Sequence, residues 1–241
     1  MKFAIFGDIH ANLHALQAVL ADAHAQKCTH YVCTGDVVGY NAFPRECLEI
    51  IRNLECPVVK GNHDEHASTN CNHDGFNELA EESMKWTSDR LAEEDKQWLQ
   101  SLRFIRTIRD FTVAHATLDT PQGWGYIFNQ LDAQASFHYQ KTQLCFVGHT
   151  HTPILYVREG NTAHALQYES FTLQPGRKYI VNVGSVGQPR DHDWRASYVT
   201  YDPTTMAVEN HRIEYDVAAA QAAIRTANLP EKLAFRLEKG Y

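Results

Sequence analysis

Five short motifs of this chain are rich in the side chains that bind metal ions and act on phosphate esters. They are Asp8-x-His10, Gly35-Asp36, Gly61-Asn62-His63-Asp64, His115 and Gly148-His149-x-His151. Carboxylate, amide oxygen and imidazole are the ligands that hard, doubly charged cations prefer over thiolate. Two such ions about 3.5 to 4 Å apart can clamp a phosphoryl group and turn a bridging water into a hydroxide nucleophile. The motifs therefore predict a two-metal site that cleaves phosphoesters without a covalent enzyme intermediate.

The seven candidate ligands form two sets around one shared carboxylate. We expect Asp36 to bridge the ions, because its two oxygens can each contact one of them. The remaining ligands divide between the ions as Asn62, His115 and His149 for one and Asp8, His10 and His151 for the other.

One histidine of the third motif is left without a place in either ligand set. His63 stands next to Asn62, so we expect it to face the substrate and protonate the leaving oxygen. Help from a general acid of this kind is typically worth about 10²- to 10⁴-fold. We expect the neighbouring Asp64 to support the loop or a ligand from behind.

The elements that must position these motifs are short apolar runs that read as strands. The runs are 3–6, 31–33, 58–59, 111–113 and 144–147. Loops at the carboxyl ends of strands in an open α/β fold converge on one crevice, so motifs far apart in the sequence can meet there. An apolar stripe from Leu13 to Ala23 and a proline-initiated segment from Pro44 predict helices between the first strands, and hence a parallel β-α-β-α-β arrangement over residues 1–64.

The rest of the chain predicts a second, strand-rich half. Residues 76–104 read as helical, with Trp86, Leu91, Trp98, Leu99 and Leu102 on the buried face. Further strands are expected at 111–115, 144–148, 154–158, 178–183, 196–202 and 206–214. The tail from 216 to 239 reads as two helices separated by Pro230. We expect an α/β fold in which two sheets face each other with helices outside, the second half adding an antiparallel layer.

Composition narrows the class of protein. The 241 residues are 44% hydrophobic, as suits a buried globular core, and the formal net charge is −7. This charge argues against a dominant basic face for duplex DNA or an anionic membrane. We find no apolar stretch of about 20 residues and no secretory signal, and expect a cytoplasmic location. The six cysteines contain no CxxC pair, so we expect reduced thiols.

Each motif alone also has an ordinary structural interpretation, since Asp after a strand is common in turns and a lone His is usually structural. In conjunction, the motifs resemble the pattern of the calcineurin-like metallophosphoesterase superfamily, D-x-H, GD, GNH[DE], H and GHxH. The segments 35–40, 145–153 and 182–190 are similar to its YfcE-like bacterial and archaeal phosphodiesterase branch. The resemblance extends over most of residues 1–202 and implies a four-layer αββα sandwich in a single domain, 1–241. It also implies the ligand assignment above and two divalent or trivalent ions, with manganese as the leading candidate and iron, zinc, nickel or magnesium as alternatives.

Two positions depart from patterns of that superfamily. Its protein serine/threonine phosphatases continue GD with Val-Asp-Arg-Gly, whereas this chain has Val37-Val38-Gly39-Tyr40. The phosphate-binding arginine of those enzymes is therefore absent at that point, which disfavours a protein phosphatase. Ala116 follows His115 where glycine is frequent in the family.

The sequence leaves substrate recognition open. Arg190, beside Asp191 and His192, could clamp a phosphate or cap a loop. Tyr40, together with Asn41, Trp124 and Tyr126, could stack on a base or serve packing. The segment 65–75, with His66, could edge the cleft or, as a less favoured alternative, hold a third metal with Cys71 and His73. We expect a small phosphorylated substrate, with a nucleotide such as a dinucleoside polyphosphate among the candidates, and leave the oligomeric state open.

The sequence is compatible with three functions. The first is hydrolysis of phosphodiesters or phosphoanhydrides, and the second is a phosphomonoesterase. The third is a non-catalytic binding scaffold, since the superfamily includes a trafficking-complex subunit with an impaired site. His63 favours catalysis, because a scaffold has no physical need for a proton donor beside intact metal ligands.

Overall fold

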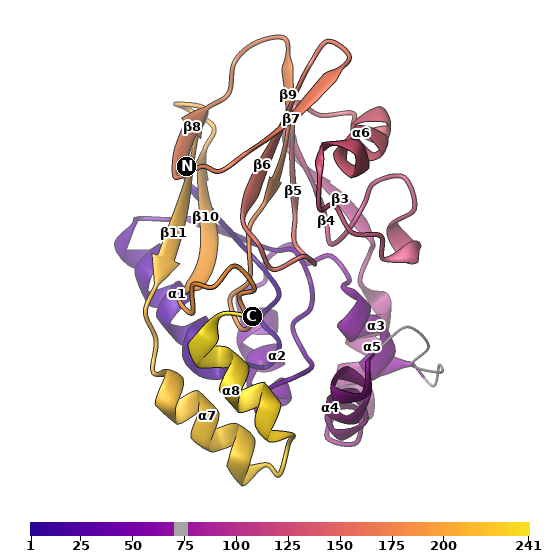
Figure 1. Cartoon of the computed structure of the whole chain (residues 1–241), viewed down its shortest axis with the longest axis vertical. Helices are drawn as coiled ribbons and strands as arrows, with labels where there is room; N and C mark the ends of the chain where they lie inside the picture. Colours follow the sequence, from indigo (N-terminus) through magenta and orange to yellow (C-terminus); the bar gives the residue numbers. More distant parts are fainter. Residues whose placement is uncertain (70–76) are drawn as a thin grey trace.

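The computed structural model describes residues 1–69 and 77–241, which fold into two facing β-sheets with helices on the outside (Figure 1). The five-stranded sheet has the order β2 (His30–Cys33), β1 (Phe3–Phe6), β10 (Ala196–Asp202), β11 (Ala207–Ile213), β8 (Ser170–Thr172). The six-stranded sheet has the order β3 (Ile105–Ile108), β4 (Phe111–Ala114), β5 (Leu144–Val147), β9 (Arg177–Asn182), β6 (Ile154–Glu159), β7 (Thr162–Leu166).

Both sheets mix parallel and antiparallel pairs. In the five-stranded sheet β1 pairs parallel with β2 and antiparallel with β10. In the six-stranded sheet β4, β5 and β9 are parallel, while β3, β6 and β7 are antiparallel to their neighbours. The predicted four-layer fold of two mixed sheets is confirmed. The division into a parallel first half and an antiparallel second half is wrong, because β10 and β11 extend the sheet of β1 and β2.

Three apolar layers hold the sandwich together. The middle layer lies between the sheets, where Phe3 and Ile5 of β1 pack with Phe111 and Phe146 of the other sheet. One outer layer joins the five-stranded sheet to helices, and the other joins the six-stranded sheet to a single helix. Burial of apolar surface on both faces of each sheet is what fixes the strand ends in place.

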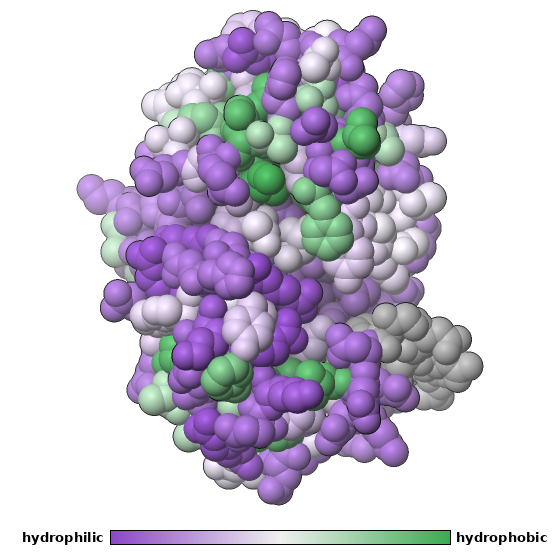
Figure 2. Space-filling model, viewed as in Figure 1, coloured by the Kyte–Doolittle hydropathy of each residue, from purple (hydrophilic) through white to green (hydrophobic). Residues whose placement is uncertain are grey.

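The helices divide between the two outer faces. Helices α1 (Leu13–Ala25), α2 (Pro44–Asn53), α7 (Val217–Thr226) and α8 (Glu231–Lys239) contribute to the layer over the five-stranded sheet. Helix α6 (Gln130–Tyr139) packs on β6, β7 and β9 of the other sheet. Helices α3 (Asn62–Ser68), α4 (Glu78–Ser88) and α5 (Glu93–Ser101) contribute to the same apolar cluster as α1, α2, α7 and α8, and α3 contacts both α4 and α5. The outward side of α7 and α8 is largely hydrophilic (Figure 2).

Local chemistry explains several of the helix ends. The Asn12 side chain accepts a hydrogen bond from the Ala15 amide at 3.2 Å and so caps the start of α1. Pro44 occupies the first turn of α2, where the missing amide proton is not needed. Helix α8 ends at Gly240, whose φ of +67° is left-handed backbone that favours glycine.

Several elements differ from the sequence prediction. Val58 and Val59 form isolated β-bridges and not a strand. Residues 76–104 contain two helices, α4 and α5, and the strand β3 follows immediately. The strands β3, β7 and β8, the helices α3 and α6, and the short 3₁₀ turn Pro121–Gly123 were not expected. In the described ranges, no helix is long and apolar enough to span a membrane.

Candidate metal centre and active-site cleft

Six of the seven candidate ligands lie in loops that follow β1, β2, β4 and β5, and the seventh, Asn62, begins helix α3. Five of them adopt left-handed backbone, an arrangement that is uncommon for residues other than glycine: Asp8 (φ 48°), His10 (48°), Asp36 (52°), His149 (71°) and His151 (60°). Strained backbone of this kind persists where the surrounding structure fixes it, and it clusters at functional sites. The surrounding structure therefore holds these loops in backbone conformations that the residues would not adopt by their own preference.

The structure brings the predicted ligands into two groups that share Asp36. The first group is Asp8, His10, Asp36 and His151, and the second is Asp36, His115 and His149. One potential ligand atom from each residue lies within 4.8 Å of those of the others in its group. All of these residues are buried. Asn62 joins the second group, because its Oδ1 lies 3.2 Å from Nε2 of His115.

The inward-facing atoms crowd around two points. Nε2 of His151 lies 3.0 Å from Nε2 of His10 and 3.1 Å from Oδ1 of Asp8. Around the other point, Nε2 of His115 lies 3.4 Å from Oδ2 of Asp36 and 3.1 Å from Nδ1 of His149. Oδ2 of Asp36 is also 3.6 Å from Nε2 of His10, so this one oxygen faces both groups.

Each imidazole points one nitrogen inward because a backbone carbonyl holds the other. The pairs are His10 Nδ1 with Val38 O (3.2 Å), His115 Nδ1 with Thr34 O (2.9 Å), His149 Nε2 with Trp124 O (2.9 Å) and His151 Nδ1 with Gln188 O (2.6 Å). A carbonyl only accepts, so these outer nitrogens carry protons, and the inner nitrogen presents a lone pair wherever the imidazole is neutral. Lone pairs facing one another at 3.0 Å across a buried space call for a cation, and the donor set fits metal ions.

Burial and charge tune these groups in opposite directions. Burial lowers the pKa of His10 and of His151 well below the usual value, which keeps both imidazoles neutral. Burial would raise the pKa of Asp36, but His115 and His63 outweigh it and hold that pKa well below the usual range. Burial would lower the pKa of His115, yet Asp36 raises it to about 9. Asp36 is therefore ionised, which is the form in which a carboxylate can bridge two metal ions.

Two glycines allow the loops to approach the carboxylates closely. A Cβ atom on Gly148 would lie 2.2 Å from Oδ2 of Asp8, and one on Gly61 would lie 2.0 Å from Oδ1 of Asp36. No side chain fits at either position without moving a candidate ligand.

Asp64 holds the second and third motifs together. Its carboxylate accepts hydrogen bonds from the amides of Asp36 (2.8 Å), Val37 (2.8 Å) and Gly61 (3.0 Å). The amide of His63 in turn donates to Oδ1 of Asp36 at 2.8 Å. The expected supporting contact of Asp64 is therefore present.

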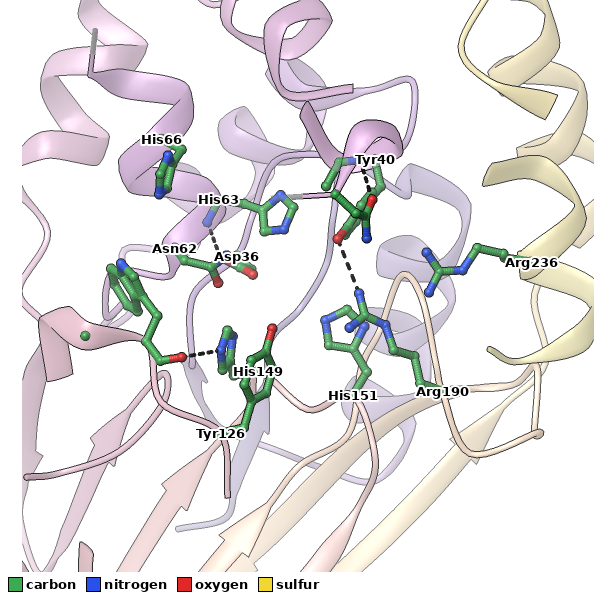
Figure 3. Close-up of a pocket in the computed structure, with 14 residues that line it drawn as sticks. Asp36, Tyr40, Asn62, His63, His66, Tyr126, His149, His151, Arg190 and Arg236 are labelled. Carbon is green, nitrogen blue, oxygen red and sulfur yellow. Dashed lines mark hydrogen bonds between the residues drawn. The ribbon is translucent and has the colours of Figure 1, made fainter. Parts of the chain in front are cut away.

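A cleft of about 320 Å³ opens over the ligand groups. Figure 3 shows His63 and Tyr40 on the side of the cleft opposite Tyr126 and His149, with Arg190 beside His151. His63 is buried and its ring centroid lies 4.5 Å from that of Tyr40. Arg190 donates to Oε1 of Gln188 at 3.0 Å and to the Tyr40 hydroxyl at 3.4 Å. The predicted catalytic and substrate-contacting residues thus share one cleft with the candidate ligands.

The aromatic candidates for base stacking are placed differently from one another. Tyr126 lies parallel to the His149 ring at 4.1 Å and is 45% exposed. Trp124 lines the cleft, but its Nε1 donates to Glu65 at 3.1 Å. Asn41 is buried and donates to the His10 carbonyl at 2.7 Å, which is a structural role.

Further residues line the cleft or support the candidate ligands without belonging to any of the five motifs. Arg236 of α8 lines the cleft, as Figure 3 shows, although no motif surrounds it in the sequence. Ser185 donates to the Asp8 carbonyl at 2.7 Å and supports the first motif from a distant segment. His66 lines the cleft as expected, whereas Cys71 and His73 lie outside the described residues.

Comparison with known proteins places the chain in a family. Residues 1–206 match the model of the calcineurin-like phosphoesterase superfamily domain. An uncharacterized protein of Methanocaldococcus jannaschii is 39% identical over 98% of this chain and 97% of its own length. The chain therefore belongs to the calcineurin-like phosphoesterase superfamily, and the resemblance found in the sequence is confirmed.

One solved structure with high sequence identity agrees with this assignment. A metallophosphoesterase from Sphaerobacter thermophilus is 40% identical, with 100% of this chain and 99% of that chain covered and a TM-score of 0.88. The phosphoesterase YfcE of E. coli is a more distant match, with 20% identity, coverage of 89% and 100%, and a TM-score of 0.46.

Proposed function

We propose that this protein is a two-metal phosphoesterase that hydrolyses phosphodiester or phosphoanhydride bonds in a small phosphorylated substrate. The observation that carries this proposal is the pair of buried ligand groups that share Asp36. Membership of a phosphoesterase superfamily supports the reaction class. The single domain over residues 1–241 and the cytoplasmic location remain predictions from the sequence.

In this proposal the chain supplies one ligand set for each ion. Asn62, His115 and His149 would hold one ion, Asp8, His10 and His151 would hold the other, and Asp36 would be shared between the two sets. When bound, two such ions would neutralise charge on the phosphoryl group and activate the attacking water. Manganese is our leading candidate because the family resemblance implies it, and a ligand set without thiolate is compatible with it.

The remaining cleft residues orient the substrate and handle the proton. His63 borders the cleft and lies beside the proposed ligands, so we assign it the role of protonating the leaving oxygen. Burial lowers the pKa of the His63 imidazole to about 4 when no substrate charge is present. An anionic phosphoryl group next to it would favour the protonated form that this role requires. Arg190 and Tyr40 would contact the substrate's phosphoryl oxygens.

A nucleotide is the substrate class that we favour, because flat rings extend from the proposed metal centre to the surface. Tyr126 lies parallel to His149, and Phe128 lies parallel to Tyr126 at 4.9 Å with an interplanar angle of 8°. Phe128 is 65% exposed, so this face is available to a base.

The test compares a diester with the matching monoester. Protein stripped with a chelator and resupplied with manganese is assayed with bis-p-nitrophenyl phosphate and with p-nitrophenyl phosphate. We expect manganese-dependent turnover that favours the diester. Turnover that favours the monoester would replace this proposal by the phosphomonoesterase, and binding of metal without turnover of either ester or of a nucleotide panel would favour the scaffold.

A further inference from the structure

We propose that Arg190 and Arg236 form a subsite for a second phosphoryl group, adjacent to the one that is cleaved. The inference rests on the proposed function and narrows its substrate class to molecules with linked phosphates, such as nucleoside polyphosphates. It gives a role to Arg236, which lies beyond the residues matched by the family model.

The two guanidinium groups lie along the same cleft. Both residues line it, and Figure 3 shows them following one another away from Asp36, with Arg190 nearer to it. The amide of Arg190 donates to the carbonyl of the proposed ligand His151 at 3.1 Å, which ties this arginine to the metal centre. A phosphoryl group at Asp36 would therefore have Arg190 beside it and Arg236 one step further out.

Neither arginine forms an ion pair with an Asp or Glu side chain in the part of the chain that the structure describes. The acidic residues nearest to Arg190 in sequence are engaged elsewhere, since Asp191 pairs with Arg212 and Asp193 pairs with Arg195 at 2.6 Å. Nε of Arg190 is buried and has no hydrogen-bond partner. Arg236 donates its Nε at 2.5 Å to the backbone oxygen of Tyr241, the last residue of the sequence.

Helix α8 is fixed so that Arg236 stays in the cleft. Leu233 and Leu237 of this helix are buried and belong to the apolar cluster over the five-stranded sheet. The helix ends at Gly240, whose carbonyl accepts a hydrogen bond at 2.8 Å from the amide of His192, in the loop that begins with Arg190. A Cβ atom on Gly240 would lie 2.7 Å from the backbone of Asp193, so the helix end and this loop are in close contact. The two arginines are therefore held relative to each other.

Two like charges in a partly buried cleft call for an anion between them. Burial lowers the pKa of Arg236, and the charge of Arg190 lowers it further. The two guanidinium groups lie near each other in a chain whose net charge is −7. Guanidinium groups bind phosphate oxygens with paired hydrogen bonds, and a second phosphoryl group offers the charge and oxygens that both arginines can share.

The test measures binding of two inorganic probes to the manganese-loaded protein by calorimetry. Pyrophosphate can occupy both positions, whereas phosphate fills only the one at the metal centre. We expect Arg236→Gln to weaken pyrophosphate binding by about 10- to 100-fold and phosphate binding by less than about 3-fold. Arg236→Lys should give an intermediate loss, because it keeps the charge but not the paired hydrogen bonds.

The matched control is Lys232→Gln, which removes one exposed positive charge from the same helix and should leave both dissociation constants unchanged. Equal losses for phosphate and pyrophosphate, or no loss for either, would overturn the subsite. Because binding is read without turnover, a protein that fails to hydrolyse any ester but still shows this discrimination would refute the proposed function and support the subsite.

Discussion

Asp36 is the residue at which the two ligand groups meet, and His63 is the residue beside them with no place in either group. The two side chains can be separated experimentally, because one is proposed to hold metal and the other to move a proton. The sequence already suggests this difference in role, because His63 directly follows the proposed ligand Asn62 but is needed in neither ligand set. The structure adds the contact between the His63 amide and Oδ1 of Asp36.

Replacing His63 by alanine should lower kcat by about 10²- to 10⁴-fold and leave the metal content unchanged, because the proton donor is lost and the ligands remain. Turnover of a diester and metal analysis of the same preparation check this. A matched control is His138→Ala, an exposed histidine on α6, which should change neither value. Loss of metal in parallel with activity would move His63 from the acid role to a structural one.

At the scale of the elements, the loops that carry the candidate ligands pass very close to one another. The turn after β5 passes so near to Asp8 that a Cβ atom on Gly148 would lie 2.2 Å from Oδ2 of that carboxylate. Asp64 similarly joins the loop after β2 to the start of α3 through its hydrogen bonds to backbone amides. The loops are therefore coupled, so that a substitution in one loop displaces a candidate ligand in another.

Gly148→Ala should weaken manganese binding by about 10-fold or more while the chain stays folded, because the added methyl group displaces Asp8 and misplaces a ligand. Metal titration followed by calorimetry measures the effect, and circular dichroism checks the fold. Gly123→Ala serves as the control, since a Cβ there would meet Thr120 at an ordinary 3.5 Å. Unchanged manganese affinity in the Gly148 variant would remove Asp8 from the ligand set.

The candidate ligands were predictable because each motif is contiguous and four of the five follow strands with a clear apolar run. Helix α3 was missed because Gly-Asn-His-Asp reads as a turn, whereas the Asp64 carboxylate accepts from the Gly61 amide and starts a helix there. Strand β7 was missed because its residues are alternately half-buried and exposed, without a strong apolar pattern. Arg236 could not be predicted, because its position depends on how α8 packs on the rest of the molecule.

At the scale of the whole molecule, the two-sheet fold brings together loops whose side chains repel one another. The inner lone pairs of His10 and His151 face each other at 3.0 Å in a buried space, so the fold is under electrostatic stress when no cation is bound. Metal ions that bind the folded chain and not the unfolded one must stabilise the fold by mass action, by about 2.7 kcal/mol at a free concentration 100 times the dissociation constant.

Chelator-treated protein should therefore unfold at a lower temperature than protein resupplied with manganese, with a shift of about 5 °C or more. Differential scanning calorimetry measures the two midpoints. The variant Asp36→Asn should show a much smaller shift, because it lacks the shared carboxylate charge. An identical midpoint with and without manganese in the wild-type chain would mean that the buried groups do not form a metal site.

In the proposed function, two ions that share Asp36 are both needed for phosphoester hydrolysis. The most direct measurement is a manganese titration of the stripped protein in which bound metal and hydrolysis of bis-p-nitrophenyl phosphate are read at each point. We expect turnover to rise to its maximum only as the second ion binds, and Asp36→Asn to lose at least one ion and nearly all activity. Full activity with one ion bound per chain, or with none, would contradict the account.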